Sequence, residues 1–360
     1  MAEDQIVSES TIRKACGDLD LPRMGVIEQV WDTDPIPEAE VASEASKTVS
    51  ELDFGDVPEG GEVAVGVGSR GIDNLATIVR GVVEGIREEG YDPFVFTAMG
   101  SHGGATAAGQ REKLATLGVT EESVDCEIRS TMETVTIGRT PERDVPVYVD
   151  ENAYEADAIV PVNRLKPHTD FSGEVESGLS KMLVIGMGNQ RGAKMAHDWS
   201  VEWSLRNMLP EITLRLLESL PVPGGVAIVE DQHDETTHLE GVPHTSFLER
   251  EAELLDLSWE LMPKLPFEEM DILVVDELGK DVSGQGMDTN ITGRRHFTLN
   301  EPEPESPEIY RIYLRGYTDK TAGNAMGMGQ ADFAHRNILT DLDWAKSTIN
   351  AITASTVRGV

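Results

Sequence analysis

The sequence has 360 residues, which is longer than a typical single domain and predicts two domains that share a cleft. Its formal net charge is −35, from 65 acidic and 30 basic residues, and this argues against binding to nucleic acid or to an anionic membrane. The acidity is spread along the chain, so we expect a halophilic protein of a high-salt cytoplasm, where screening suppresses self-repulsion. An ordinary acidic protein of a low-salt cell is the alternative.

The cysteines and the amino-terminal residues indicate a cytoplasmic protein. Cys16 and Cys126 are the only two cysteines, too few for a disulfide scaffold or a thiolate metal site. The first residues carry acids where a secretory signal would carry bases, and no apolar run approaches the roughly 20 residues that span a bilayer. We therefore expect a soluble, cytoplasmic protein.

Strands and helices alternate after an acidic lead-in at 1–60, in which only residues 24–30 have the pattern of a strand. The expected elements are strands at 62–68 and 93–99 and helices at 75–89 and 107–117. The repeated order of strand, polar turn and helix predicts parallel βαβ units.

The rest of the chain predicts further strands and a second domain. The expected elements are strands at 145–149, 158–162, 226–230, 271–276 and 311–317, helices at 203–217 and 247–262, and a loop at 231–246. Pro263 and Pro266 end the second helix, which we expect to link two domains. The predicted fold is α/β, with a larger N-terminal, Rossmann-like parallel-sheet domain at 1–250, a smaller C-terminal α/β domain at 268–360, and the active site between them.

Residues 161–199 concentrate reactive side chains within a glycine-rich framework. His168, Lys181 and His197 lie among five glycines, which permit close approaches that a side chain would forbid. The segment follows the strand expected at 158–162, and ligands of open α/β sheets bind at the carboxyl ends of strands. We therefore expect the chemistry here.

Two histidines follow predicted strands in polar turns. His102 and His168 are suited to proton transfer near neutral pH, and two facing imidazoles can take a proton on one side of a centre and return it on the other. The alternative for each is a hydrogen-bonded structural residue. His197 is a candidate metal ligand, although a lone histidine is a poor metal site by itself. Lys181 precedes an apolar run, so burial could lower its pKa and make it a nucleophile or attachment point, whereas a lysine that extends to solvent is the alternative.

Basic side chains beside glycine-rich turns are candidate anion ligands. Arg70 could hold a phosphate or carboxylate from the larger domain, and Lys280 and Arg294 could do so from the smaller one. None of the glycine turns has the spacing of a dinucleotide fingerprint or a Walker loop. A diffusible NAD site or an ATP site is therefore not expected.

Four motifs together resemble the nickel-dependent lactate racemase family and its 2-hydroxyacid racemase and epimerase homologues. They are GSHG at 100–103, KPH at 166–168, SGLSK at 177–181, and His197, and they occur in the family's order. The resemblance extends from about Gly61 to the end of the chain.

The resemblance implies an isomerase that works by reversible hydride transfer to a nickel-pincer nucleotide, a pyridinium mononucleotide built by maturation proteins and tethered to a lysine. By motif, Lys181 is the attachment residue, His197 the nickel ligand, and His102 and His168 the acid/base pair. Arg70 is assigned to cofactor binding. The N-terminal domain would hold the cofactor and the C-terminal domain would close over the substrate.

Two features depart from the family. The segment between His168 and Ser177 is longer and contains Glu174 and Glu176. The glutamine and lysine that hold the substrate carboxylate in the family are not found at their spacing, and Lys280, Gln285 and Arg294 offer polar contacts instead. So polar a loop suits a sugar acid or another 2-hydroxyacid with more hydroxyls than lactate. The alternatives are a metal-dependent hydroxyacid lyase or dehydratase, and a non-catalytic protein that binds an anionic metabolite.

Overall fold

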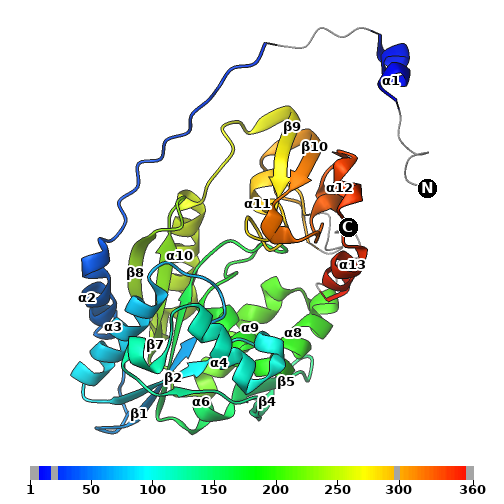
Figure 1. The fold of residues 1–360 in the computed structure, drawn as a ribbon. Helices are drawn as coiled ribbons and strands as arrows, with labels where there is room; N and C mark the ends of the chain where they lie inside the picture. Colours follow the sequence, from blue (N-terminus) through cyan, green and yellow to red (C-terminus); the bar gives the residue numbers. More distant parts are fainter. Residues whose placement is uncertain (1–7, 18–22, 296–300, 354–360) are drawn as a thin grey trace. The chain divides into compact units, whose positions relative to one another are not determined.

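A computed structural model describes residues 8–17, 23–295 and 301–353, and its contacts divide them into two compact units. The larger unit contains residues 33–264 and 301–303, and the smaller unit contains the others. Both are of mixed α/β type, as predicted, and Figure 1 shows each of them. No helix among the described residues is both long and apolar enough to cross a membrane.

A six-stranded sheet forms the centre of the larger unit. In spatial order its strands are β3 (Ile128–Arg129), β2 (Asp92–Thr97), β1 (Glu62–Val67), β6 (Ala158–Arg164), β7 (Gly224–Glu230) and β8 (Thr236–Pro243). All neighbours are parallel except β7 and β8. Every residue of β7 is buried, and β1 is buried from Val63 onward, which is typical of parallel strands covered on both faces.

Helices cover the sheet on both sides (Figure 1). On one side lie α2 (Glu38–Val49) and α3 (Leu75–Glu88), and on the other α8 (Asn189–Trp203), α9 (Leu205–Ser219) and α10 (Phe247–Leu261). The buried residues of α3 recur at helical spacing, so one stripe of the helix faces the core. The remaining elements of this unit are α4 (Ala107–Thr116), α5 (Glu121–Val124), β4 (Thr134–Arg139), β5 (Pro146–Asp150), α6 (Glu151–Glu155), α7 (Leu179–Lys181) and the π-helix η3 (Met182–Gly186).

The smaller unit contains a three-stranded parallel sheet. Its strands are β9 (Glu269–Leu278), β10 (Glu308–Tyr317) and β11 (Phe333–Ala334), and its helices are α11 (Thr289–Thr292), α12 (Asn337–Thr340) and α13 (Trp344–Thr353). Its small core joins Leu278, Met287, Leu314 and Ile338. Helix α1 (Glu9–Cys16) lies in the amino-terminal residues that group with this unit.

Three sequence predictions differ from the structure. Residues 24–30 form no strand, and Val26 is 99% exposed. The lead-in contains α2, whose Val41 and Ala45 are fully buried in the core. The segment predicted as a loop at 231–246 contains β8. The strand predicted at 145–149 is confirmed as β5, which pairs with β4. The helix predicted at 247–262 is confirmed as α10.

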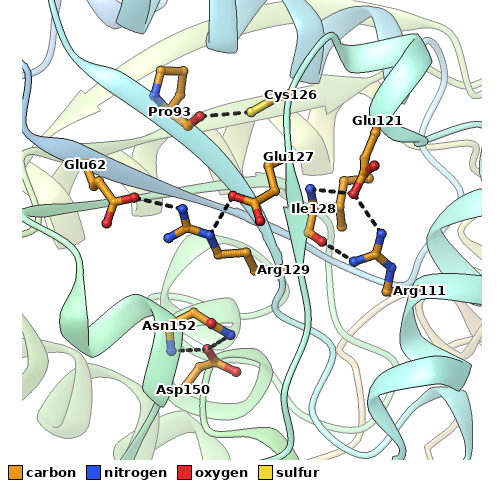
Figure 2. Close-up of polar contacts among 10 residues, drawn as sticks. All are labelled: Glu62, Pro93, Arg111, Glu121, Cys126, Glu127, Ile128, Arg129, Asp150 and Asn152. Atoms are coloured by element: carbon orange, nitrogen blue, oxygen red, sulfur yellow. Dashed lines mark hydrogen bonds and ion pairs between the residues drawn. The ribbon is translucent and has the colours of Figure 1, made fainter.

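Ion pairs fix the β3 edge of the main sheet (Figure 2). Arg129 donates to Glu62 at 2.7 Å and to Glu127 at 2.9 Å, which ties β3 to β1. Arg111 of α4 pairs with Glu121 at 2.7 Å, and the Cys126 thiol donates to the carbonyl of Pro93 at 3.0 Å. Here basic side chains are used to hold the fold together.

Gly81 lets α2 and α3 approach closely, and this contact gives a stability prediction. A Cβ at Gly81 would lie 2.3 Å from the carbonyl oxygen of Ala42 and 2.8 Å from the Cβ of Ala45. Alanine normally stabilises a helix interior over glycine, but Gly81→Ala must separate the helices, so we expect it to lower the free energy of unfolding by about 1–3 kcal/mol. Urea unfolding followed by circular dichroism measures this change. Gly71→Ala is the control because nothing lies within 4 Å of its added Cβ. Equal or greater stability of the Gly81→Ala variant would contradict the contact.

Candidate active site

Three loops with candidate side chains leave the same edge of the main sheet. β1 pairs in parallel with β2 on one side and with β6 on the other, so Val67 lies opposite both Thr97 and Val162. The chain continues from these three carboxyl ends into the loops that carry Arg70, His102 and His168. The parallel pairing therefore gathers three predicted residues at one edge.

A buried network holds the turn that carries His102. Gly100 has a φ of 61°, and its N–H donates to the carbonyl of Gly186 at 2.9 Å. The amide of Gln110, which is fully buried, donates to the carbonyl of Gly100 at 3.0 Å and accepts from the Thr97 hydroxyl at 2.7 Å. Hydrogen bonds to β2, through Gln110, and to Gly186, which follows Lys181 in the chain, therefore hold this turn in place.

The His102 ring is hydrogen-bonded and electrostatically tuned. Its Nδ1 lies 2.6 Å from the hydroxyl of Ser69. Although the side chain reaches solvent, burial by neighbouring atoms lowers the pKa of His102, and the charges of Arg70 and Lys181 lower it further. The neutral ring is therefore favoured at pH 7, as a proton acceptor requires.

Glu176 closes the loop that carries His168. It is 2% exposed, and its carboxylate accepts the backbone N–H of His168 and that of Gly173, the latter at 3.1 Å. The His168 ring packs against Phe171 in a tilted arrangement with centroids 4.5 Å apart, and Nδ1 accepts the backbone N–H of Asp170 at 3.0 Å. Because Nδ1 accepts a bond, the neutral ring carries its proton on Nε2.

Lys181 ends the short helix α7, and the wide turn η3 follows it directly. Burial lowers the pKa of Lys181 to about 8, against the opposing charges of Asp170 and Glu176, while Arg70 lowers it further. An amine with this pKa is partly unprotonated near neutral pH and can act as a nucleophile. Its Nζ lies 3.5 Å from the Ser177 hydroxyl.

His197 lies on α8 and is coupled to the same lysine. Burial lowers the pKa of His197, as does the charge of Lys181, whereas Asp170 and Asp198 raise it. A neutral imidazole is the form that binds metal ions. Among the residues that the structure describes, no three His, Cys, Asp or Glu side chains form a metal-binding group.

The larger unit thus brings Arg70, His102, Lys181 and His197 into one electrostatic environment. The charge of Lys181 lowers the pKa of both histidines, and the charge of Arg70 lowers the pKa of His102 and of Lys181. The loop of His168 borders this group, because its Asp170 acts on both Lys181 and His197. Such a cluster can hold an anion and move protons.

Arg70 and Arg164 differ in their pairing. Arg164 forms an ion pair with the buried Glu230, whose other oxygen accepts the N–H of Asp73 at 2.6 Å. Within the described ranges Arg70 is exposed and makes no hydrogen bond or ion pair. Its guanidinium is therefore available to a carboxylate or phosphate.

The three predicted substrate residues lie in the smaller unit and interact within it. Lys280 donates to the carbonyl of Gly284, and Gln285 is buried. Arg294 donates to the carboxylate of Asp332 at 2.7 Å and to the carbonyl of Ile309 at 2.7 Å. Arg294 therefore stabilises the framework of its own unit.

Sequence patterns missed several residues that shape the site. Ser69 is hydrogen-bonded to His102, and Glu251 accepts the N–H of Ser180, the residue before Lys181. The charge of Asp170 raises the pKa of Lys181 and of His197. Ser69 could have been found as a polar residue directly after a predicted strand. Glu251 lies within a predicted helix of many acids, and its periodicity alone does not distinguish it.

Comparisons with known proteins support the fold. No family model and no curated protein matches the sequence. Among solved structures, a Thermotoga maritima protein matches with a TM-score of 0.50 and 16% identity, over 79% of this chain and 72% of that one. The lactate racemase apoprotein from Thermoanaerobacterium thermosaccharolyticum matches with a TM-score of 0.50 and 11% identity, over 87% of this chain and 79% of that one. The chain therefore has a fold similar to that of lactate racemase.

The coupling between Arg70 and His102 gives a pH prediction. Because the positive charge of Arg70 lowers the pKa of His102, Arg70→Gln should raise that pKa toward the ordinary value of about 6.5, whereas Arg70→Lys keeps the charge and should leave it low. Histidine C–H resonances followed by NMR across the titration measure both variants. A His102 pKa that is the same in the wild-type and Arg70→Gln proteins would show that the two side chains are not coupled.

Proposed function

We propose that this protein is a racemase or epimerase of a 2-hydroxyacid, with a nickel-pincer nucleotide tethered to Lys181. The observation that carries the proposal is the coupling of Lys181 to His102 and His197 at the carboxyl edge of the sheet. The fold shared with lactate racemase supports it. Four sequence motifs that resemble that family supply three of these residues and His168.

The side chains fit the requirements of such a cofactor. Lys181 has a pKa lowered to about 8, so its amine can form a covalent bond near neutral pH. His197 favours its neutral form, which suits a borderline metal such as nickel. Arg70 has no partner among the described residues and can bind a phosphate. Once bound, the group would supply a hydride acceptor and a nickel ion, a chemistry that amino-acid side chains lack.

The two proposed acid/base histidines differ in which ring nitrogen carries the proton. When His102 donates its Nδ1–H to Ser69, Nε2 presents a lone pair, so His102 is ready to take the proton of the substrate hydroxyl. In His168 the bond from the Asp170 N–H places the proton on Nε2, so this ring first acts as a hydrogen-bond donor. To accept a proton at Nε2, His168 must release the bond from Asp170. The conformation of loop 166–177 therefore determines whether His168 can donate or accept a proton at Nε2.

The proposed substrate class and cellular environment rest on the charge and composition of the chain. The proposed substrate is a 2-hydroxyacid or sugar acid, and Lys280, Gln285 and Arg294 of the smaller unit are the candidate residues for its polar groups. The partners would be this small molecule and the maturation proteins of the cofactor. We place the protein in a cytoplasm rich in salt, in keeping with its net charge of −35.

Covalent attachment at Lys181 tests the cofactor. Protein produced together with the maturation enzymes should carry an adduct on the peptide that contains Lys181, with nickel in proportion, and Lys181→Ala should carry neither. Intact-protein and peptide mass spectrometry with metal analysis measure this. Lys194→Ala is the control, because Lys194 is an exposed residue of α8 paired with Asp198. An unmodified Lys181 and a nickel-free protein would exclude the tethered cofactor.

Substitution of the two histidines tests the reaction. We expect His102→Ala and His168→Ala each to slow racemisation by about 10²–10⁴-fold, because each removes a proton-transfer group. Chiral chromatography of a panel of 2-hydroxy and sugar acids measures the rates. His238→Ala is the control, since His238 binds Glu240 on β8 instead.

Deuterium on the substrate carbon separates the rival reactions. Hydride transfer retains the label in the inverted product, whereas a lyase or dehydratase that removes a proton at carbon loses it to solvent. Tight binding of an anionic metabolite by cofactor-loaded protein without turnover would instead indicate a binding protein.

A further inference from the structure

A buried carboxyl group from α10 contacts the backbone directly before Lys181. Glu251 is 1% exposed, and its two oxygens lie 3.0 and 3.1 Å from the backbone nitrogen of Ser180, whose N–H they accept. The hydroxyl of Ser180 donates to the same carboxyl group. The contact joins segments 71 residues apart in the sequence. Glu251 therefore satisfies donors at the start of α7 that the helix itself leaves unpaired.

The sequence around Lys181 is shaped to receive this carboxyl group. A Cβ at Gly178 would lie 2.3 Å from Oε1 of Glu251 and 3.2 Å from Leu165. Gly178 has extended backbone, so the close approach of Glu251 is what requires a glycine here. The Gly178 carbonyl accepts from the Asn163 amide at 2.8 Å. Two residues of the SGLSK motif, Gly178 and Ser180, thus serve the contact with α10.

The same face of α10 also holds the chain before the His168 loop. Ser258 lies two helical turns after Glu251, and its hydroxyl donates to the carbonyl of Leu165 at 3.2 Å. Phe247, Leu254 and Leu255 are buried, so α10 is fixed in the core. One rigid helix therefore contacts the backbone on both sides of loop 166–177.

The backbone at Lys181 depends on contacts from outside its own short helix. α7 has only three residues, and the wide turn η3 follows, so local backbone bonds alone define the direction of Lys181 poorly. We propose that Glu251 is a positioning residue for Lys181: it holds Ser180 so that the lysine side chain stays in its partly buried site. The inference rests on the proposed role of Lys181 as the attachment residue. Burial also raises the pKa of Glu251 to about 7, so glutamine is a close mimic of its protonated form.

The test measures the pH dependence of Lys181 acetylation in the full-length protein without cofactor. Acetic anhydride at low concentration reacts with unprotonated amines, and peptide mass spectrometry resolves each lysine. The wild-type midpoint for Lys181 should lie near pH 8. Glu251→Ala should release Ser180, admit water and move the midpoint up by about one unit or more, toward the ordinary lysine value of about 10.4. The exposed Lys194 is the reference in each sample.

Two further variants test whether the shift of the Lys181 midpoint comes from the position of Ser180, from the charge of Glu251, or from the loss of any buried carboxyl group. Glu251→Gln keeps the shape and the acceptor and should restore a midpoint within about 0.3 units of the wild type, since one unit corresponds to a tenfold change in the free amine. Asp231→Asn removes another buried carboxyl group, which accepts the backbone N–H groups of His233 and Glu235 in the turn between β7 and β8, and should leave the Lys181 midpoint unchanged. If Glu251→Ala does not fold by circular dichroism, Ser180→Ala decides, with a smaller shift in the same direction.

An unchanged Lys181 midpoint in Glu251→Ala, or in Ser180→Ala where the first variant is unfolded, would overturn the inference. A shift in Glu251→Gln as large as in Glu251→Ala would also overturn it, because charge rather than position would then be the cause. The assay uses protein without cofactor, so its outcome is independent of the attachment experiment. A missing adduct on Lys181 counts against the proposed function, whereas an unchanged midpoint counts only against the role of Glu251.

Discussion

The parallel pairing of β1 with both β2 and β6 determines where chemistry can take place in the larger unit. Since the three strands run in the same direction, their carboxyl ends place the loops of Arg70, His102 and His168 at one edge. The backbone hydrogen bonds of the sheet therefore bring together residues that are far apart in sequence. The segment with Lys181 and His197 follows the third of these loops, so the arrangement of the site depends on the order of the strands.

Burial of positive charge is the second organising feature. Arg129 and Arg111 are paired with acids that stabilise the sheet edge (Figure 2). At the candidate site, desolvation disfavours the charged forms instead and lowers the pKa of Lys181, His102 and His197. Asp170 and Glu176 offset part of this cost without neutralising it. The neutral forms of the two histidines are therefore favoured at pH 7 and the Lys181 amine is partly unprotonated, whereas the paired arginines keep their charge.

The sequence predicted the local elements well and the long-range contacts poorly. The alternation that forms β1, α3 and β2 was visible, because apolar period and glycine-bearing turns agree there. α2 was missed because its acidic surface masks the few buried positions, and β8 because polar side chains occupy much of an edge strand. The predicted strand at 24–30 was wrong, since apolar composition alone does not supply a neighbouring strand. The motifs supplied the residue types of the candidate site.

What the motifs could not supply was the support around these residues. The contact of Glu251 with Ser180 crosses 71 residues, and the bond of Glu176 to the His168 backbone depends on how a loop closes. Neither has a fixed spacing that a pattern could detect. Gly178 was recognisable as a position of close approach, but the group that approaches it became apparent only from the structure.

The junction between η3 and α8 sets the distance between the proposed attachment residue and the proposed metal ligand. In one continuous α-helix Lys181 and His197 would be separated by about 24 Å and by about 160° around the axis. The α-helical path is instead interrupted at Asn189, which has a φ of 50° and whose side-chain amide donates to Asp150 at 2.7 Å and to the carbonyl of Thr131 at 3.1 Å. η3 and α8 contact each other across this junction, and the charge of Lys181 lowers the pKa of His197. The spacing of these two side chains thus depends on one left-handed asparagine.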